Sequence, residues 1–384
     1  MADWKDNKNL GPWALEKQQN KLGYSNNPRW TDTPTAKHQP CGYWLNGEEY
    51  ILTPHYTQGT TWILKAPTIP GNGVYAQLAE YNGRLYCFNT GRLLRWNDVD
   101  AWELIAPAHA SYADVGGVHQ LLVYNGVLYV NVSGAGATTN SVLSFTEGAS
   151  KWTLVGTIIG GSYGGFTGLV IFKNLLYVIT QGGMLIKVDA GFSLVATGIS
   201  DAIYTAAVYN NKLYTAVAGW SKCGRLYEWD EAGNWIQVAP ILLYAYFVYE
   251  LINYNEVLFS RQNYGSSKLC YWNKIDSWVD VGAVLPGGSA FISGTPGSKM
   301  VVYFDKLYIC MSNNSLYVYE DVPTLKLVAA AIGTNSTLDM IEYNGRLYMT
   351  ADGSLYEFNG YGDYVSSKVG NILIVDDAVW NMPN

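Results

Sequence analysis

The sequence has little charge, few cysteines and no long apolar run, and each shortage excludes a class of protein. Only 14% of its 384 residues are charged and the net charge is −7, whereas nucleic-acid binding needs a concentrated field of Lys and Arg. No apolar run approaches the roughly 18–20 residues of a transmembrane helix. Residues 1–5 contain charges that no apolar stretch follows, so we expect no secretion signal. We therefore predict neither a nucleic-acid partner nor insertion into a membrane.

Residues that usually hold metals or form disulfides are also scarce. The five cysteines are scattered singly, and no two of them form a Cys-x-x-Cys pair. An odd number of isolated cysteines without a secretion signal favours reduced, semi-buried thiols over a disulfide framework. The four histidines show no metal-ligand spacing. We therefore predict no metal site and no cofactor.

Aromatic residues, in contrast, make up 14% of the chain, and a phrase built on them recurs along it. Its clearest copy is YNGRLY, residues 81–86, and a degraded copy ending at Tyr50 stands at the front. Successive copies lie from 36 residues (Tyr50 to Tyr86) to 49 residues (Phe259 to Tyr308) apart. The last aromatics of the other full copies are Tyr129, Tyr177, Tyr214 and Tyr348.

Each copy of the phrase predicts a small antiparallel sheet. An apolar run precedes the phrase, Asn-Gly or Asn-Asn can adopt the left-handed backbone of a two-residue hairpin turn, and Leu-Tyr begins a second strand. A Leu-x-x-aromatic pattern such as Leu93–Trp96 marks a third strand, and a later aromatic such as Trp102 marks a fourth. Repeats of this length with four strands each are typical of β-propeller blades. We expect the Trp and Tyr residues to pack between the blades.

The predicted fold is all-β, with a single β-propeller over residues 43–384 that follows an extended N-terminal arm, residues 1–42. Seven copies of the repeat are complete, and the front copy, residues 43–67, has little room for a third strand. Residues 371–380 have the pattern of an innermost strand that no phrase follows. We favour eight four-stranded blades, in a ring closed by pairing of this C-terminal strand with the N-terminal blade. Seven blades are the alternative, with the front copy capping the ring.

The N-terminal arm carries Trp4, Trp13 and Trp30 among Lys, Asn, Gln and Pro. An unstructured tail rarely contains three tryptophans in so short a span. Either the arm packs over the propeller or it docks into a partner subunit as an extended segment. Oligomeric state does not follow from the sequence.

One aligned position of the repeats predicts a polar collar at the mouth of the central channel. Nine residues before each phrase aromatic, at the start of the innermost strand, most residues are polar, whereas the position two residues further on is apolar throughout. The polar members are Gln77, Gln120, Thr205, Glu250, Lys299 and Asp339, and Gly168 holds the same position in one copy. The collar is either a solvated rim or a site for a small ligand or ion.

Aromatic residues outside the repeat pattern mark a second candidate site. They fall on loops between the second and third strands or between blades, which vary freely on a rigid scaffold. Rings among Asn, Ser and Gly suit carbohydrate or a protein surface. These loop-face candidates are Tyr112, Tyr163, Trp220, Tyr246 and Tyr264.

The pattern YNGRLY followed by Leu93–Trp96 and Trp102 resembles kelch-like propeller repeats. It lacks their Gly-Gly doublet after the second strand, to which only residues 181–183 come close. It is still more similar to the degenerate propeller repeats of bacteriophage tail-fibre and other virion proteins. This resemblance covers residues 43–380 and implies a non-enzymatic virion or surface-binding role.

We therefore expect a non-catalytic binding or structural propeller, part of a phage tail or capsid and assembled in the host cytoplasm. It would contact a host-surface glycan or protein, or other virion subunits through the arm. One alternative is a propeller enzyme, a polysaccharide lyase or glycosidase, with Glu250 or Asp339 at the channel mouth. Another is a cytoplasmic kelch-like scaffold for protein interactions.

Overall fold

The computed structural model describes residues 41–45, 48–57, 59–71, 76–109, 117–133, 139–159, 166–189, 191–199, 202–218, 224–240, 247–264, 266–284, 299–311, 314–319, 325–332 and 337–368. In these ranges the chain forms thirty strands, β1 to β30, and no helix. Nearly all of the expected arm and the expected strand at residues 371–380 lie outside them, so the structure tests neither.

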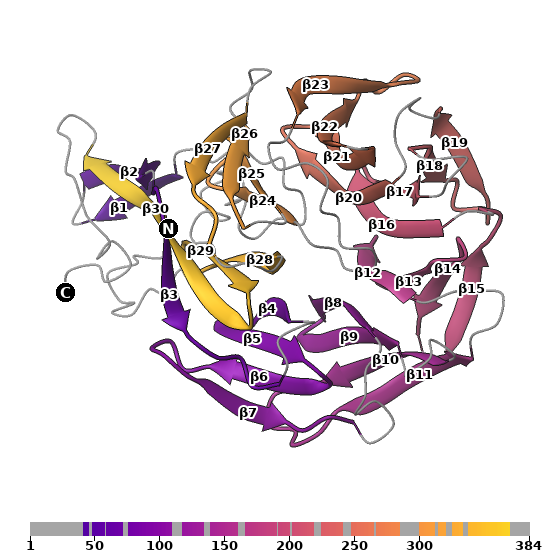
Figure 1. Cartoon of the computed structure of the whole chain (residues 1–384), viewed down its shortest axis with the longest axis horizontal. Coiled ribbons are helices and arrows are strands. Elements are labelled where there is room, and N and C mark those ends of the chain that lie inside the picture. Colours follow the sequence, from indigo (N-terminus) through magenta and orange to yellow (C-terminus); the bar gives the residue numbers. More distant parts are fainter. Residues whose placement is uncertain are drawn as a thin grey trace.

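Seven antiparallel sheets are arranged in a ring, with β4, β8, β12, β16, β20, β24 and β28 as their innermost strands (Figure 1). This arrangement confirms the prediction of a single all-β propeller with four-stranded blades. Blades 1 to 6 each consist of four consecutive strands that pair in chain order. Their strands are β4 (Gln77–Tyr81), β5 (Arg84–Asn89), β6 (Arg92–Trp96), β7 (Trp102–Ala106); β8 (Gly117–Tyr124), β9 (Val127–Ser133), β10 (Thr139–Phe145), β11 (Thr153–Ile159); β12 (Phe166–Phe172), β13 (Leu175–Thr180), β14 (Leu185–Val188), β15 (Phe192–Ala196); β16 (Ala202–Tyr209), β17 (Lys212–Ala218), β18 (Leu226–Trp229), β19 (Trp235–Ala239); β20 (Phe247–Tyr254), β21 (Val257–Tyr264), β22 (Ser266–Trp272), β23 (Trp278–Val284); and β24 (Lys299–Tyr303), β25 (Lys306–Cys310), β26 (Leu316–Tyr319), β27 (Leu325–Ala329).

Blade 7 is assembled from both ends of the chain. Its first three strands are β28 (Thr337–Tyr343), β29 (Arg346–Ala351) and the first part of β30 (Ser354–Lys368). Its fourth strand is β3 (Trp62–Ala66), which pairs antiparallel with β30. The front copy of the repeat thus supplies an outer strand to the last blade and forms no blade of its own. The preference for eight blades is wrong, and the seven-blade alternative is confirmed.

The second half of β30 extends beyond blade 7. It pairs with β2 (Glu48–Thr57), which in turn pairs with β1 (Cys41–Leu45). The two ends of the chain therefore pair with each other through residues 354–368, whereas the pairing expected of residues 371–380 lies outside the described residues.

Each hairpin between the first and second strands of a blade closes with two residues in left-handed backbone, as the Asn-Gly phrase predicts. Asn and Gly reach this conformation at low cost, and it matches the twist of the two strands. The φ angles are 49° and 68° at Asn82 and Gly83, and 47° and 57° at Asn210 and Asn211. The hairpins hold adjacent first and second strands in one register all around the ring.

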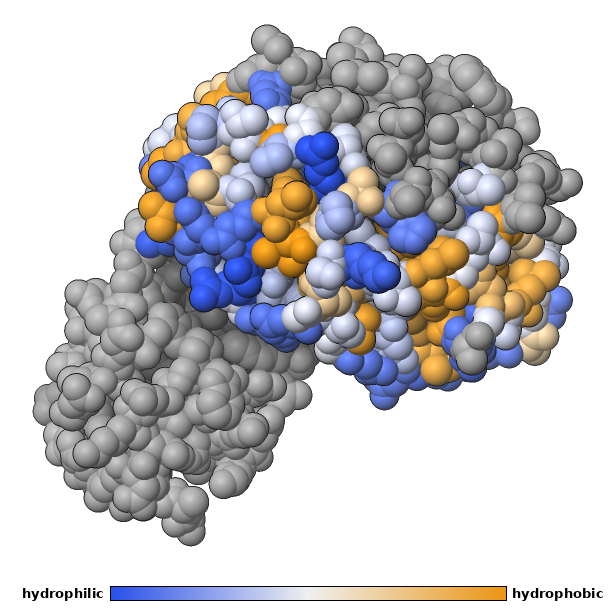
Figure 2. All heavy atoms as spheres, turned by 90° about the horizontal axis from the view of Figure 1, so that it is seen from below, coloured by the Kyte–Doolittle hydropathy of each residue, from blue (hydrophilic) through white to orange (hydrophobic). Residues whose placement is uncertain are grey.

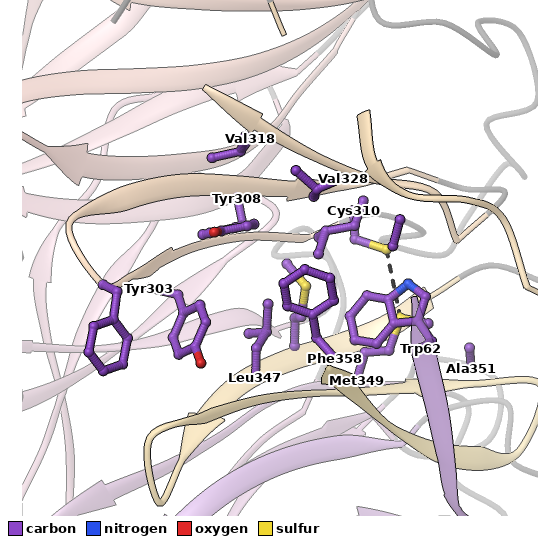
Figure 3. Close-up of a cluster of buried hydrophobic side chains, with 14 residues drawn as sticks. Trp62, Tyr303, Tyr308, Cys310, Val318, Val328, Leu347, Met349, Ala351 and Phe358 are labelled. Carbon is purple, nitrogen blue, oxygen red and sulfur yellow. Dashed lines mark hydrogen bonds between the residues drawn. The ribbon is translucent and has the colours of Figure 1, made fainter. Parts of the chain in front are cut away.

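Aromatic side chains pack across the interfaces between blades, which confirms the prediction from the repeat. Trp96 of blade 1 lies against Tyr348 of blade 7, with 5.3 Å between ring centroids. Trp272 of blade 5 lies against Tyr214 of blade 4 at the same distance. Figure 3 shows the interface of blades 6 and 7, where Phe358 packs on Tyr308 and on Trp62. Because Trp62 belongs to β3, the N-terminal strand is part of the core.

In six of the seven blades the first tyrosine of the phrase joins its blade to the next by a hydrogen bond. Its hydroxyl donates to the carbonyl oxygen of the second turn residue of the following blade. The six bonds are Tyr81 to Gly126 (3.0 Å), Tyr124 to Asn174 (2.7 Å), Tyr209 to Glu256 (2.9 Å), Tyr254 to Asp305 (3.0 Å), Tyr303 to Gly345 (2.8 Å) and Tyr343 to Gly83 (3.2 Å). The last of them closes the ring between blades 7 and 1. We call this set the tyrosine ring.

Blade 3 interrupts the tyrosine ring because Phe172 stands where the other blades have tyrosine. Its ring packs against Trp229 of blade 4 at 5.8 Å between centroids, as the tyrosines pack against the next blade. It has no hydroxyl to donate to the turn carbonyl of Asn211.

We predict that Phe172→Tyr raises the free energy of unfolding by about 1 kcal/mol, the usual net contribution of one hydrogen bond. The new hydroxyl would donate to the Asn211 carbonyl. Chemical denaturation checks this, with Tyr209→Phe as the matched control that removes such a bond and lowers stability by about the same amount. A stabilised Tyr209→Phe variant, or an unchanged Phe172→Tyr variant, would contradict the role assigned to the tyrosine ring.

Candidate functional site

The predicted collar residues all lie at the same place in the fold, at the start of the innermost strands. Gln77 and Lys299 are the first residues of β4 and β24. In the other five blades a β-bulge directly precedes the collar position, as between Val248 and Glu250. A bulge bends the strand and redirects the side chains next to it.

The innermost strand of each blade has no neighbour on its axial side, so alternate backbone N–H groups there lack a partner within the sheet. In four blades the collar side chain supplies that partner for the next blade. Its oxygen accepts the N–H of the residue that follows the next collar position. The bonds are Leu169 N–H to Gln120 (2.9 Å), Leu251 N–H to Thr205 (3.1 Å), Met300 N–H to Glu250 (2.7 Å) and Leu78 N–H to Asp339 (2.7 Å). The bond to Asp339 closes the ring between blades 7 and 1.

The collar carries most of its charge on blades 5, 6 and 7. Lys299 lies 3.3 Å from an oxygen of Asp339, which is only 5% exposed. The carboxylate of Asp339 raises the pKa of Lys299, with a smaller contribution from Glu250. Burial raises the pKa of Glu250, although the positive charges of Lys299 and Arg261 partly offset that effect.

Arg261 is a member of this charged group that the sequence analysis missed. It lies on β21 directly opposite Glu250 and is 1% exposed. A buried arginine is rare unless its charge is balanced. The signal in the sequence was an arginine two residues after the phrase aromatic Phe259, just behind the apolar start of the strand.

The structure leaves the other predicted site residues untested. Of the loop-face candidates, Tyr112, Tyr163, Trp220 and Tyr246 lie outside the described ranges, and Tyr264 ends β21 with its side chain undescribed. The arm residues Trp4, Trp13 and Trp30 lie outside them as well. The collar is therefore the one predicted site whose residues the structure brings together.

The hydrogen bonds that the collar acids accept limit the chemistry available at the collar. Both oxygens of Asp339 accept backbone N–H groups, one from Leu78 and the other from Met340 at 2.9 Å. One oxygen of Glu250 accepts a third backbone N–H, that of Met300.

Within the described ranges no three His, Cys, Asp or Glu side chains are grouped as a metal site would require. The same part of the chain contains no helix with the length and apolar character needed to cross a membrane.

No protein-family model and no curated protein matches the sequence. Solved structures do resemble it. A catalytically inactive variant of virginiamycin B lyase from Staphylococcus aureus, with quinupristin, has a TM-score of 0.58 at 8% identity, over 81% of this chain and 99% of that one. The WD40 β-propeller domain of Doa1 has a TM-score of 0.54 at 15% identity, over 78% and 97%. YCF48 bound to D1 peptide has a TM-score of 0.54 at 11% identity, over 79% and 99%. At such identities the likeness shows the propeller fold alone.

We predict that Asp339→Ala lowers the free energy of unfolding by about 2–4 kcal/mol, because it leaves the Leu78 N–H uncapped and the Lys299 ammonium unpaired. Asp339→Asn keeps one acceptor oxygen, so its free energy of unfolding should fall less than that of Asp339→Ala. Chemical denaturation of the two variants checks the order. Equal stability of both variants and the wild type would show that ring closure does not depend on this side chain.

The raised pKa of Glu250 predicts a pH-dependent effect. A carboxyl whose pKa is higher in the folded chain than its usual 4.5 stabilises the fold below that value and loses this contribution as the pH rises through the raised pKa. Glu250→Gln stays neutral and can still accept the Met300 N–H. It should therefore be more stable than the wild type at pH 7, with the difference vanishing below about pH 4.5. Denaturation curves across this range check it, and a less stable variant at pH 7 would refute the burial argument.

Proposed function

We propose that this protein is a non-catalytic binding propeller, in which the face at the collar end holds the ligand. The observation that carries the proposal is the bonding of the collar acids. Glu250 and Asp339 each accept a backbone N–H from the next blade. A carboxylate that holds the scaffold together in this way is poorly placed to act as a general acid or base, which must be free to exchange a proton with substrate.

The topology explains why the collar end would be the binding face. The collar residues lie where the innermost strand of each blade starts. The chain therefore passes from blade to blade, and from the second to the third strand of a blade, at the collar end of the ring. All five aromatic loop-face candidates fall on or next to these connections, and Tyr264 ends β21. Loops on a rigid scaffold can vary without loss of the fold.

The opposite end of the ring is built of short turns that are locked by their own side chains. The side-chain oxygen of Asn97 accepts the N–H groups of residues 99–101, and that of Asn273 accepts those of residues 275–277. Asp230 accepts two in the same way from Ala232 and Asn234. These turns stabilise the scaffold and leave little room for a variable binding surface.

The described outer strands expose apolar side chains at scattered positions. Single leucines are exposed on five outer strands, at one aligned position: Leu64, Leu104, Leu154, Leu194 and Leu327. Figure 2 shows the hydrophobic residues of one side in patches separated by hydrophilic ones. Isolated exposed leucines are common on protein surfaces. The collar-end face is thus the better candidate.

The partner in this proposal is a host-surface glycan or protein, and the setting is a virion. The resemblance of the repeats to those of phage tail-fibre proteins supports both points. The peptide in the YCF48 structure is consistent with ligand binding by a propeller of similar fold. In this proposal the arm with Trp4, Trp13 and Trp30 attaches the propeller to other subunits of the particle, which would be assembled in the host cytoplasm.

Glycan-array binding tests the proposal. We expect the wild type to bind a restricted set of glycans, and Trp220→Ala or Tyr264→Ala to reduce binding at least about tenfold, as loss of an anchoring aromatic usually does. The matched control is Ile275→Ala, which truncates a side chain that is 77% exposed on the opposite end of the ring. Equal binding by all variants would rule out the loop face.

A wild type that binds no glycan but retains binding to purified host surface protein, lost in Trp220→Ala, would assign a protein ligand instead. Turnover of a polysaccharide by the wild type that Glu250→Gln abolishes would overturn the non-catalytic assignment.

A further inference from the structure

The collar is interrupted between blades 3 and 4. Gly168 occupies the collar position of blade 3 and has no side chain to cap the following blade. We propose that this gap is a binding site for a carboxylate group, which takes the place of the missing collar oxygen and accepts the N–H of Ala206. The proposal concerns the wall of the ring and does not depend on the loop-face aromatics.

The pairing register of blade 4 directs the Ala206 N–H toward the axis of the ring. Tyr209 and Lys212 close the hairpin, and the pairing alternates from there, so residues 207 and 205 bond to β17 whereas Ala206 does not. Ala206 is the equivalent of Leu169, Leu251 and Met300, whose N–H groups all point away from their own sheet to a collar oxygen. The Ala206 N–H therefore points to the place where a side chain of residue 168 would lie.

Gln120 is the one neighbour that borders the gap, and backbone geometry does not require a glycine there. A Cβ atom built on Gly168 would lie 3.3 Å from the side-chain oxygen of Gln120, which would have to shift by a few tenths of an ångström, and no other atom outside residues 167–169 lies within 4 Å; the backbone of Gly168 is not in the left-handed region. Gly168, Thr205 and Ala206 are all partly exposed to solvent. A small group that enters along the axis can thus reach the N–H.

Other contacts hold the interface of blades 3 and 4, so the gap does not have to close. Phe172 and Tyr177 pack against Trp229. Lys173 forms an ion pair with Glu231. These contacts hold blades 3 and 4 together without a side chain at the collar position.

The other collar bonds define what the gap would accept. In other blades the equivalent N–H groups are capped by an amide oxygen of Gln120, the hydroxyl of Thr205, and the carboxylates of Glu250 and Asp339. Among these the carboxylate makes the strongest bond, since its charge assists the hydrogen bond. The chemical class of ligand is therefore an organic acid or an acidic group that projects from a larger ligand.

Amide hydrogen exchange and chemical shifts of the selectively ¹⁵N-labelled, full-length protein test the site. We expect the Ala206 amide to exchange at least about tenfold faster than those of Leu169, Leu251 and Met300, which have protein caps. Sodium acetate should shift the Ala206 resonance in a saturable way and slow its exchange, whereas sodium chloride of the same ionic strength should not. Protection of Ala206 equal to that of the capped amides, or no saturable shift with acetate, would overturn the proposal.

Two variants at the same interface make the test specific. Gly168→Gln copies the cap that Gln120 provides, so it should protect the Ala206 amide and abolish the acetate response. Phe172→Tyr alters the other end of the interface, so it should change neither the exchange rate of the Ala206 amide nor its response to acetate. If Gly168→Gln does not fold, Gly168→Ser carries the same prediction with a shorter hydroxyl cap. An acetate response that persists in a folded, capped variant would contradict the assignment.

A converse variant creates a second site. Thr205→Ala removes the cap from the Leu251 N–H, so acetate should then shift the Leu251 resonance as it shifts that of Ala206 in the wild type. Acetate that leaves Leu251 unaffected in this variant would show that an open collar position does not bind a carboxylate.

Discussion

The innermost strand of every blade has one edge with no neighbouring strand, and the rest of the structure depends on how that edge is satisfied. Backbone N–H groups on such an edge are costly to leave unpaired when they are buried. In four blades such an N–H is capped by a side chain of the preceding blade: Gln120, Thr205, Glu250 or Asp339. Because each cap crosses from one blade to the next, satisfying the edges also links the sheets into a ring.

A second set of bonds works at the other end of the same strands. Collar caps cross four of the seven interfaces and tyrosine bonds cross six, with an aromatic core between the two levels. Both sets reach from blade 7 to blade 1, through Asp339 and Tyr343, so the closing interface has a bond of each kind. Both sets lack a bond at the interface of blades 3 and 4, where β12 carries Gly168 and Phe172. The propeller is therefore uneven around its circumference, although its repeats are regular.

Much of the fold is readable from the sequence because it is encoded locally. The phrase YNGRLY specifies a turn and two strands within a few residues, and its first tyrosine makes the same bond to the next blade in six of the seven blades. The number of blades is not local, since it depends on whether Trp62 pairs with Phe358 at the far end of the chain. The polar collar was predictable as a set of residues. Its role as a chain of caps was not, because the distance from Asp339 to the Leu78 N–H is set by the curvature of the whole ring.

Native-state hydrogen exchange of the capped amides tests most directly that the collar closes the ring. The amides of Leu78, Leu169, Leu251, Met300 and Met340 all lie on strand edges and would exchange freely without their caps. If the collar is continuous across the closing interface, Leu78 should be as strongly protected as Leu169 and Leu251, and all should lose protection together on global unfolding. Rapid exchange of Leu78, with Leu169 and Leu251 still protected, would mean that the ring is open between blades 7 and 1.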